Sequence, residues 1–297
     1  MSHRNKIAFF GTSHTYGDCA EGVSTHRDQK KFVKRTWCEY FAKTLNKEFH
    51  NFGIGGSDNM VQLDSILEAF NRGKMDDVDT LILEPRLSYD TVRLPYDNIG
   101  YKAKGQTEFG SIDYTTHWHD TGRDIQIPAW PDPYPFTENL WARFNLNDLK
   151  SEQKFQHRLN ADYLGSQHDK PMEDKDIRKF VELSKLYLTD SQYLDYMNFQ
   201  FIKNVYILCK TAGIDFFWIN WESNRFFNRF MQEDNLFFEN DRHILDLCLH
   251  HDNTVRYHIK ELNLPYEVEC TCGHFNDYAQ PYISSYLIKG YNERKNN

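Results

Sequence analysis

The first 84 residues alternate short apolar runs with stretches of helical spacing, and this alternation constrains the fold more than any other feature. The runs at 6–10, 49–52 and 79–84 have the length of strands, and the last has the unbroken apolar centre typical of a strand buried in a parallel sheet. Residues 30–46 and 59–70 place apolar side chains at helical spacing. The order strand, helix, strand, helix, strand predicts an α/β fold with a doubly wound, mostly parallel sheet flanked by helices.

The regular pattern stops after this part and resumes towards the C-terminus. Residues 88–148 are rich in Tyr, Asp, Pro, Gly and Trp, and their aromatics predict an ordered insertion with a satellite core, in preference to a sugar-binding wall. After it, we expect a helix over 176–209, a strand over 214–221 and a second, mostly helical insertion over 225–262. A last strand over 266–269 and a closing helix over 279–291 are expected to complete the chain. The expected organisation is a single domain over 1–297, with insertions at about 88–148 and 225–262.

Composition narrows the classes of protein and of partner. A hydrophobic share of 40% with 26% charged residues suits a globular chain, and the formal net charge of −8 gives no basic surface for nucleic acid. No stretch approaches the roughly 20 apolar residues of a membrane span, and the run at 7–10 is too short for the core of a signal peptide. The six cysteines are therefore expected to be reduced thiols in a cytoplasmic protein.

A serine follows the first predicted strand, in the motif Gly-Thr-Ser-His-Thr-Tyr-Gly at 11–17. Open α/β sheets bind ligands at the carboxyl ends of their parallel strands, so Ser13 is placed to act as a nucleophile. Backbone N–H groups that follow it could face a developing oxyanion. A turn that only caps a helix is the alternative for this motif taken alone.

A glycine-rich turn follows the second predicted strand, as Asn-Phe-Gly-Ile-Gly-Gly-Ser-Asp-Asn at 51–59. Glycines let the backbone approach a ligand closely and turn N–H groups towards it. A phosphate-binding loop is the alternative, but the spacing is not G-x-G-x-x-G and the turn follows the second strand instead of the first.

A histidine precedes the predicted closing helix, in Cys-Gly-His-Phe-Asn-Asp-Tyr-Ala-Gln-Pro at 272–281. A serine nucleophile needs a base, and a histidine with a pKa of about 6.5 can take up its proton. A surface histidine near a helix start is the alternative for His274. Cys270, Cys272 and His274 could also meet one Zn²⁺, but no second cysteine pair accompanies them, so no metal and no cofactor are expected.

Taken together, these three motifs resemble the SGNH (GDSL-like) hydrolase superfamily, in the style found in phage and environmental sequences. That family carries G-D-S-x-[ST]-x-G, N-x-G-x-x-G and D-x-x-H blocks in this order, and the Ala-Gln-Pro tail is similar to its thioesterase/lysophospholipase branch. The resemblance covers roughly residues 5–90 and 214–290. It implies the flavodoxin-like three-layer SGNH fold, with Ser13 as nucleophile, His274 as base, and the N–H groups of Ser13 and Gly56 lining the oxyanion hole.

The third strand departs from the family's pattern. It runs into Glu-Pro-Arg-Leu-Ser at 84–88, where the family has G-x-N-D with an Asn that completes the oxyanion hole. Arg86 stands near that position and could donate to an oxyanion, bind a substrate carboxylate or pair with Glu84. Asn59 is a further candidate for oxyanion or substrate binding.

This chain also differs from the family at two positions where the family carries an acidic residue. Thr12 replaces the aspartate of G-D-S, and Thr271 replaces the acid three residues before the histidine. An orienting carboxylate normally fixes the tautomer of such a histidine. A backbone carbonyl, Glu269 or Asp277 would therefore have to orient His274.

These features predict an acyl or O-acetyl esterase that acts on a small ester or an acylated glycan through a Ser-His dyad and an acyl-enzyme. One alternative is a catalytically weak or inactive SGNH fold that serves as a structural or carbohydrate-binding module. Such a module could form a homo-oligomer or belong to a virion, if a phage encodes it. An O-acyltransferase that uses the same acyl-enzyme is a further alternative.

Overall fold

The computed structural model describes eleven stretches of the chain, and these fall in two compact units that are treated separately below. The first unit comprises 1–87, 123–128 and 195–297, and the second comprises 88–122 and 129–194. The described stretches are 4–17, 36–53, 59–87, 91–95, 141–145, 157–159, 191–221, 242–250, 254–265, 267–269 and 273–295.

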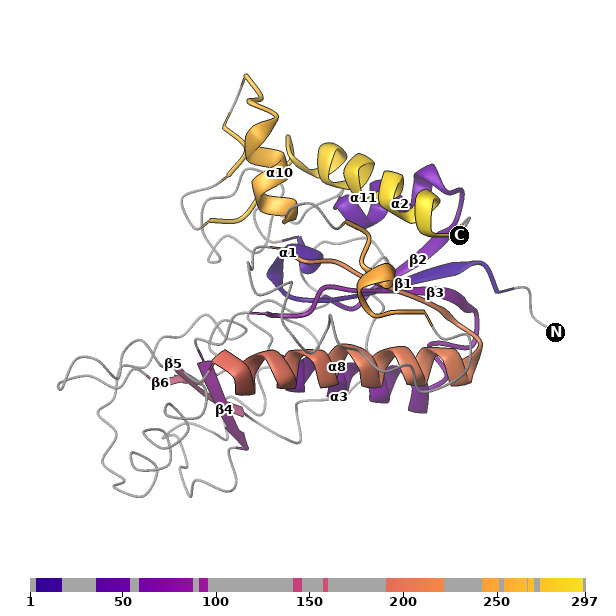
Figure 1. The fold of residues 1–297 in the computed structure, drawn as a ribbon, viewed down its shortest axis with the longest axis vertical. Coiled ribbons are helices and arrows are strands. Elements are labelled where there is room, and N and C mark those ends of the chain that lie inside the picture. The colour runs from indigo at the N-terminus through magenta and orange to yellow at the C-terminus, as the bar shows by residue number, and fades with distance from the viewer. Residues whose placement is uncertain are drawn as a thin grey trace, which may run out of the picture. The chain divides into compact units, whose positions relative to one another are not determined.

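The first unit is built on a four-stranded sheet in the order β2-β1-β3-β7, in which all neighbours are parallel (Figure 1). Phe9 in β1 lies opposite Asn51 in β2 and Ile82 in β3. Beyond β7, an isolated parallel bridge joins Trp218 to Cys248 at the edge of the sheet. The strands are β1 (Lys6–Phe10), β2 (Glu48–Asn51), β3 (Val78–Leu83) and β7 (Asp215–Trp218).

These strands form where the sequence predicts them, with ends that differ by a few residues. The last four residues of β1 and of β3 are buried without alternation, because helices cover both faces of the sheet. The predicted α/β architecture, with a parallel sheet flanked by helices, is therefore confirmed.

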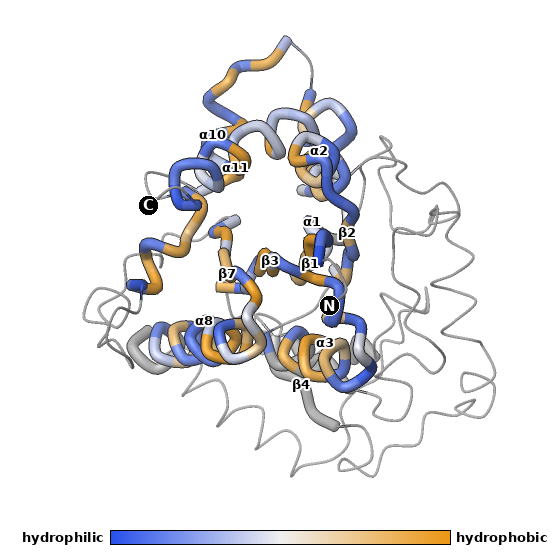
Figure 2. Tube along the Cα trace, turned by 90° about the vertical axis from the view of Figure 1, so that its right-hand side faces the viewer, coloured by the Kyte–Doolittle hydropathy of each residue, from blue (hydrophilic) through white to orange (hydrophobic). Residues whose placement is uncertain are grey.

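Figure 2 shows the two helical layers on either side of the sheet. The helices α2 (Trp37–Thr44), α10 (Val255–Glu261) and α11 (Gln280–Lys295) lie on one side. The helices α3 (Asn59–Asn71) and α8 (Ser191–Ala212) lie on the other. Among the described residues, no helix has the length and apolar character needed to cross a membrane.

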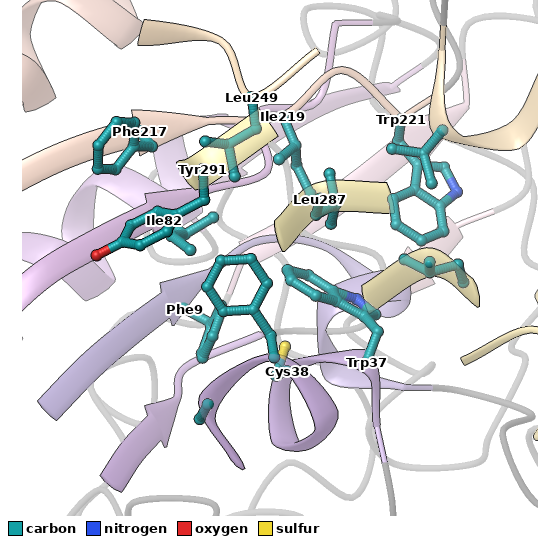
Figure 3. Packing of buried hydrophobic residues seen from close by; sticks show 14 of the residues in the cluster. Phe9, Trp37, Cys38, Ile82, Phe217, Ile219, Trp221, Leu249, Leu287 and Tyr291 are labelled. Atoms are coloured by element: carbon teal, nitrogen blue, oxygen red, sulfur yellow. The ribbon is translucent and has the colours of Figure 1, made fainter. Parts of the chain in front are cut away.

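A hydrophobic core lies between the sheet and the layer of α2 and α11 (Figure 3). Phe9 stands edge-on to Trp37, with ring centroids 5.2 Å apart, and to Phe41, at 5.8 Å. On the opposite face, Phe10 stacks on Phe52 at 4.5 Å. Aromatic pairs in these geometries add to the stability that burial provides, so β1 is held firmly on both sides.

The edge of the sheet differs from the sequence prediction. Residues 266–269 were expected to form the last strand, but 267–269 contribute only an isolated antiparallel bridge from Glu269 to Phe275. The place beside β7 is taken by buried Cys248 and Leu249, which belong to the insertion predicted at 225–262. These two side chains can be buried against β7, whereas 267–269 remain partly exposed. The 3-10 helix η5 (Leu245–Leu247) and α10 supply helical structure within the same insertion.

The second unit contains a three-stranded antiparallel sheet in the order β4-β5-β6. Its strands are β4 (Thr91–Pro95), β5 (Trp141–Asn145) and β6 (His157–Leu159). The first two fall within the insertion predicted at 88–148, and the third lies beyond it. The aromatics of this insertion that were expected to form a satellite core include Trp141, which lies in β5. The others lie outside the described residues, and they are Trp118, Trp130, Tyr134 and Phe136.

Candidate active site

A tight turn at the carboxyl end of β1 carries Ser13. Gly11 leaves the strand, Thr12 is the N-cap, and Ser13 is the first residue of the short helix α1 (Ser13–Tyr16). A Cβ on residue 11 would lie 2.7 Å from the Cβ of Glu84, which is closer than packed carbon atoms approach. Glycine at this position therefore lets the turn lie directly against the residue that follows β3.

That residue, Glu84, is buried and accepts hydrogen bonds from both sides of the serine. The backbone N–H groups of Thr12 and Thr15 donate to Oε2, at 3.2 and 2.9 Å. The hydroxyls of the same two threonines also donate to the carboxyl group, one to each oxygen. From the sequence, a pair between Glu84 and Arg86 was one possibility. In the structure, the carboxyl group of Glu84 accepts these four hydrogen bonds from the turn around Ser13.

Burial raises the pKa of Glu84 to about 7, because ionisation inside the protein loses the hydration of the charge. The hydrogen bonds from Thr12 and Thr15 act in the opposite direction, since they favour the ionised form. The carboxyl group beneath the turn therefore titrates in the neutral range.

The carbonyl groups of α1 are held by residues that follow it in the chain. Trp37 Nε1 donates to the carbonyl of His14 at 3.1 Å. Asn51 Nδ2 donates to the carbonyl of Thr15 at 2.8 Å, and Cys38 Sγ lies 3.6 Å from the same oxygen. Asn51 is the first residue of the glycine-rich motif at 51–59. This motif therefore contributes a side chain that holds the turn of Ser13.

His274 reaches this turn from the other end of the sequence. Its Nε2 lies 2.6 Å from Ser13 Oγ, within the hydrogen-bond distance expected for a nucleophile and its base. Phe275, the next residue, is buried in the core between the sheet and the layer of α2 and α11, and it anchors the loop. The two residues named from the sequence as a dyad therefore meet, and their catalytic roles remain a prediction.

Cations organise the loop that carries His274. Arg256 on α10 donates through Nη2 to the carbonyl of Gly273, a residue with a positive φ of 83°. Its Nε lies 3.2 Å from Glu269, which also pairs with Lys260 at 3.1 Å. Glu269, one of the acids considered for orienting the histidine, is thus paired with two cations.

A second histidine, His14, lies against the dyad, and no feature of the sequence pattern had indicated it as a site residue. The ring of His14 stacks on Trp221 with centroids 4.4 Å apart and lies 4.9 Å from the ring of His274. Burial lowers the pKa of His14 well below its ordinary value, and the charges of His274, Arg256 and Arg86 lower it further. A neutral imidazole therefore lines one side of the site.

The remaining predicted site residues have different surroundings. Asn59 accepts from the backbone N–H of Arg86 at 2.7 Å and donates to its carbonyl and to the side chain of Asn198, both at 3.0 Å. Its amide thus holds the segment after β3. The charge of Arg86 contributes to the lowered pKa of His14. Gly56 lies outside the described residues.

Within the described ranges, no group of three or more His, Cys, Asp or Glu side chains could hold a metal ion. Cys270 and Cys272, which the zinc alternative requires, lie outside those ranges. Three other cysteines, Cys38, Cys209 and Cys248, are buried free thiols.

Comparison of the chain with protein-family models, with curated proteins and with solved structures found no match. The function is therefore inferred from the geometry of the site and from the resemblance of its motifs.

Proposed function

We propose that this chain is an SGNH-type ester hydrolase that works through a Ser-His dyad. The observation that carries the proposal is the 2.6 Å separation of His274 Nε2 from Ser13 Oγ, between residues 261 positions apart in the sequence. The pair lies at the carboxyl edge of a parallel sheet, where open α/β folds bind their ligands.

In the proposed reaction, Ser13 Oγ attacks the acyl carbonyl carbon while His274 Nε2 takes its proton. The tetrahedral intermediate collapses, the C–O bond to the alcohol breaks, and the imidazolium returns the proton to the departing oxygen. A water molecule, deprotonated by the same histidine, then attacks the acyl-enzyme. The C–O bond to Ser13 Oγ breaks, the imidazolium returns the proton to Oγ, and the acid and the free serine are released. No cofactor takes part in either half of this proposed sequence.

The oxyanion would be stabilised mainly by backbone. Ser13 is the first residue of α1, so its N–H has no partner within that helix and can donate to the substrate. Gly56 is the second proposed donor, from the family resemblance. Arg86 is the candidate for the third position, because its charge already acts on His14 next to the nucleophile.

The sheet supports the finer fold assignment. Strands β2, β1, β3 and β7, followed by the bridged segment at Cys248, give the strand order 2-1-3-4-5 of flavodoxin-like folds. This order agrees with the three-layer SGNH fold that the motifs predict.

The test is covalent labelling of the purified protein by a fluorophosphonate, measured by intact mass and peptide mapping. We expect one adduct, on Ser13, and none in Ser13→Ala. His274→Gln should slow labelling by at least about 100-fold, as expected for loss of a general base. Ser285→Ala, which removes an exposed hydroxyl bonded to the carbonyl of Pro281, is the matched control and should label normally.

Labelling of Ser13→Ala at the unaltered rate would remove this serine from the mechanism. A wild-type protein that takes up no probe would favour the second candidate function, a structural or carbohydrate-binding module. The observation behind that candidate concerns the segment after β3, where the family has an oxyanion-hole Asn and this chain has none. The side-chain amide of Asn59 is bonded to Arg86 and Asn198 instead of facing a substrate. Short acyl esters and O-acetylated glycans, each tested with and without an added alcohol acceptor, would then separate hydrolysis from acyl transfer.

A further inference from the structure

We propose that Glu84 is a positioning residue, whose ionised carboxylate holds the turn of Ser13 so that Oγ faces His274. This inference rests on the proposed function, since it assigns a part in the same reaction. Glu84 does not contact Oγ in the described structure, and it acts through the residues on either side of the serine.

The first support is the match between donors and acceptor. Thr12 and Thr15 present two N–H groups and two hydroxyls to the carboxyl group, and all four donate. An ionised carboxylate only accepts hydrogen bonds, so it can satisfy all of them at once. A protonated carboxyl group carries its own O–H, which must displace one of these donors or find another acceptor.

The second support is the placement of the donors along the chain. Thr12 precedes Ser13 and Thr15 follows it by two residues, so the carboxylate fixes the turn on both sides of the nucleophile. In addition, the side chains of Trp37 and Asn51 donate to carbonyl groups of α1. The orientation of the Ser13 side chain is thus determined by a backbone that is bonded at both ends.

The hydrogen bonds from Thr12 and Thr15 are the interactions that most favour the ionised form of Glu84. Titratable or charged groups lie on the surrounding elements, among them His14 on α1, Cys38 on α2, Arg86 after β3 and His274 before α11. Burial raises the pKa of Glu84 to about 7, and the hydrogen bonds from Thr12 and Thr15 are the largest influences that oppose this shift. Glu84 therefore changes from the protonated to the ionised form in the neutral pH range. Its protonation state should affect both the conformation of the turn and the reactivity of Ser13.

The first experiment measures the turn without any catalysis. In protein labelled with ¹⁵N-threonine, we expect the amide signals of Thr12 and Thr15 to shift together with pH, around a common midpoint near 7. Glu84→Gln should abolish this shared transition. Two amides that titrate unchanged in Glu84→Gln, or that do not titrate in the wild type, would overturn the proposal.

The second experiment measures the rate of fluorophosphonate labelling. We expect Glu84→Gln to label on the order of 100-fold more slowly than the wild type, the loss typical of a reacting group displaced by about 1 Å. With a short ester, the loss should fall on kcat and leave KM nearly unchanged, because Glu84 does not contact substrate. Glu84→Asp, which keeps the charge, should recover part of the rate.

The control is Glu39→Gln, which changes another buried glutamate, on α2, whose side chain pairs with Lys43. It should label at the wild-type rate. If Glu84→Gln does not fold, as judged by circular dichroism, Thr15→Val removes one of the four donors and should slow labelling about 10-fold. Wild-type rates in Glu84→Gln, or in Thr15→Val, would overturn the role of Glu84.

The two proposals fail in different ways. If the wild-type protein takes up no probe, the proposed function fails, while the threonine amides still show whether Glu84 holds the turn. If the wild type labels on Ser13 and Glu84→Gln labels equally fast, the hydrolase stands and the positioning role is refuted.

Discussion

Gln280 Oε1 accepts the backbone N–H of Trp37 at 2.9 Å and so joins the first turn of α11 to the first turn of α2. Through Nε2 the same side chain donates to the carbonyl of Phe275 at 3.1 Å, one residue after His274. Trp37 in turn donates through its indole to His14, in the turn of Ser13. One buried amide thus connects the loop of the base with the helix that holds the turn of the nucleophile.

Gln280→Ala should lower the free energy of unfolding by about 1–3 kcal/mol, because it leaves a buried N–H and a buried carbonyl without this partner. Urea denaturation followed by circular dichroism measures the change. Gln200→Ala, which shortens a partly exposed glutamine on α8, is the control and should change stability by less than about 0.5 kcal/mol. Equal losses in the two variants would contradict the connecting role of Gln280.

Gly11→Ala should destabilise the protein by about 1–3 kcal/mol and also slow labelling of Ser13, because the added Cβ would lie 2.7 Å from the Cβ of Glu84. Thermal unfolding and probe kinetics measure the two effects. Gly213→Ala is the control, since its positive φ of 66° causes backbone strain at the end of α8, away from the site. That variant should lose stability and keep the labelling rate. A Gly11→Ala protein as reactive as the wild type would show that the turn tolerates displacement of Glu84.

Stability should decrease with rising pH through the titration of Glu84. Its pKa is about 7 in the folded protein, against 4.5 ordinarily, so between these values the unfolded chain has released a proton that the folded chain retains. The free energy of unfolding should therefore fall by about 3 kcal/mol in total across this interval and stay level above it. Urea denaturation of the wild type and Glu84→Gln from pH 4.5 to 8.5 gives the difference curve. A difference that does not change with pH would contradict the raised pKa.

His14 should have the opposite effect on stability. Its pKa lies well below 6.5 in the folded protein, so as the pH falls below 6.5 the unfolded chain takes up a proton that the folded chain does not. The folded state is then destabilised by acid through this residue, and His14→Phe should remove that dependence. The ¹³Cε1–¹H signal of His14 should remain that of a neutral ring at pH 6. A signal that titrates near 6.5 would contradict this prediction, and His243→Phe, at a partly exposed histidine, is the control.

The sequence by itself determined the elements of the sheet and the two ends of the site. The buried strands β1 and β3 and the helices α2, α3 and α11 follow from local apolar periodicity, which depends only on neighbouring residues. Ser13 and His274 could be named because each lies in a short motif next to such an element. Their separation of 2.6 Å then follows from strands that bring their carboxyl ends to one edge.

Only the tertiary structure decided what surrounds the dyad. In the sequence, Glu84 is only the last residue of a predicted strand. Its four hydrogen bonds from Thr12 and Thr15 form because β1 and β3 lie side by side in the sheet. The edge position beside β7 likewise went to Cys248 instead of 266–269, because burial against Trp218 decides it and local pattern does not. Local periodicity fixes which residues form an element, whereas hydrogen bonds between buried polar groups depend on which distant elements pack together.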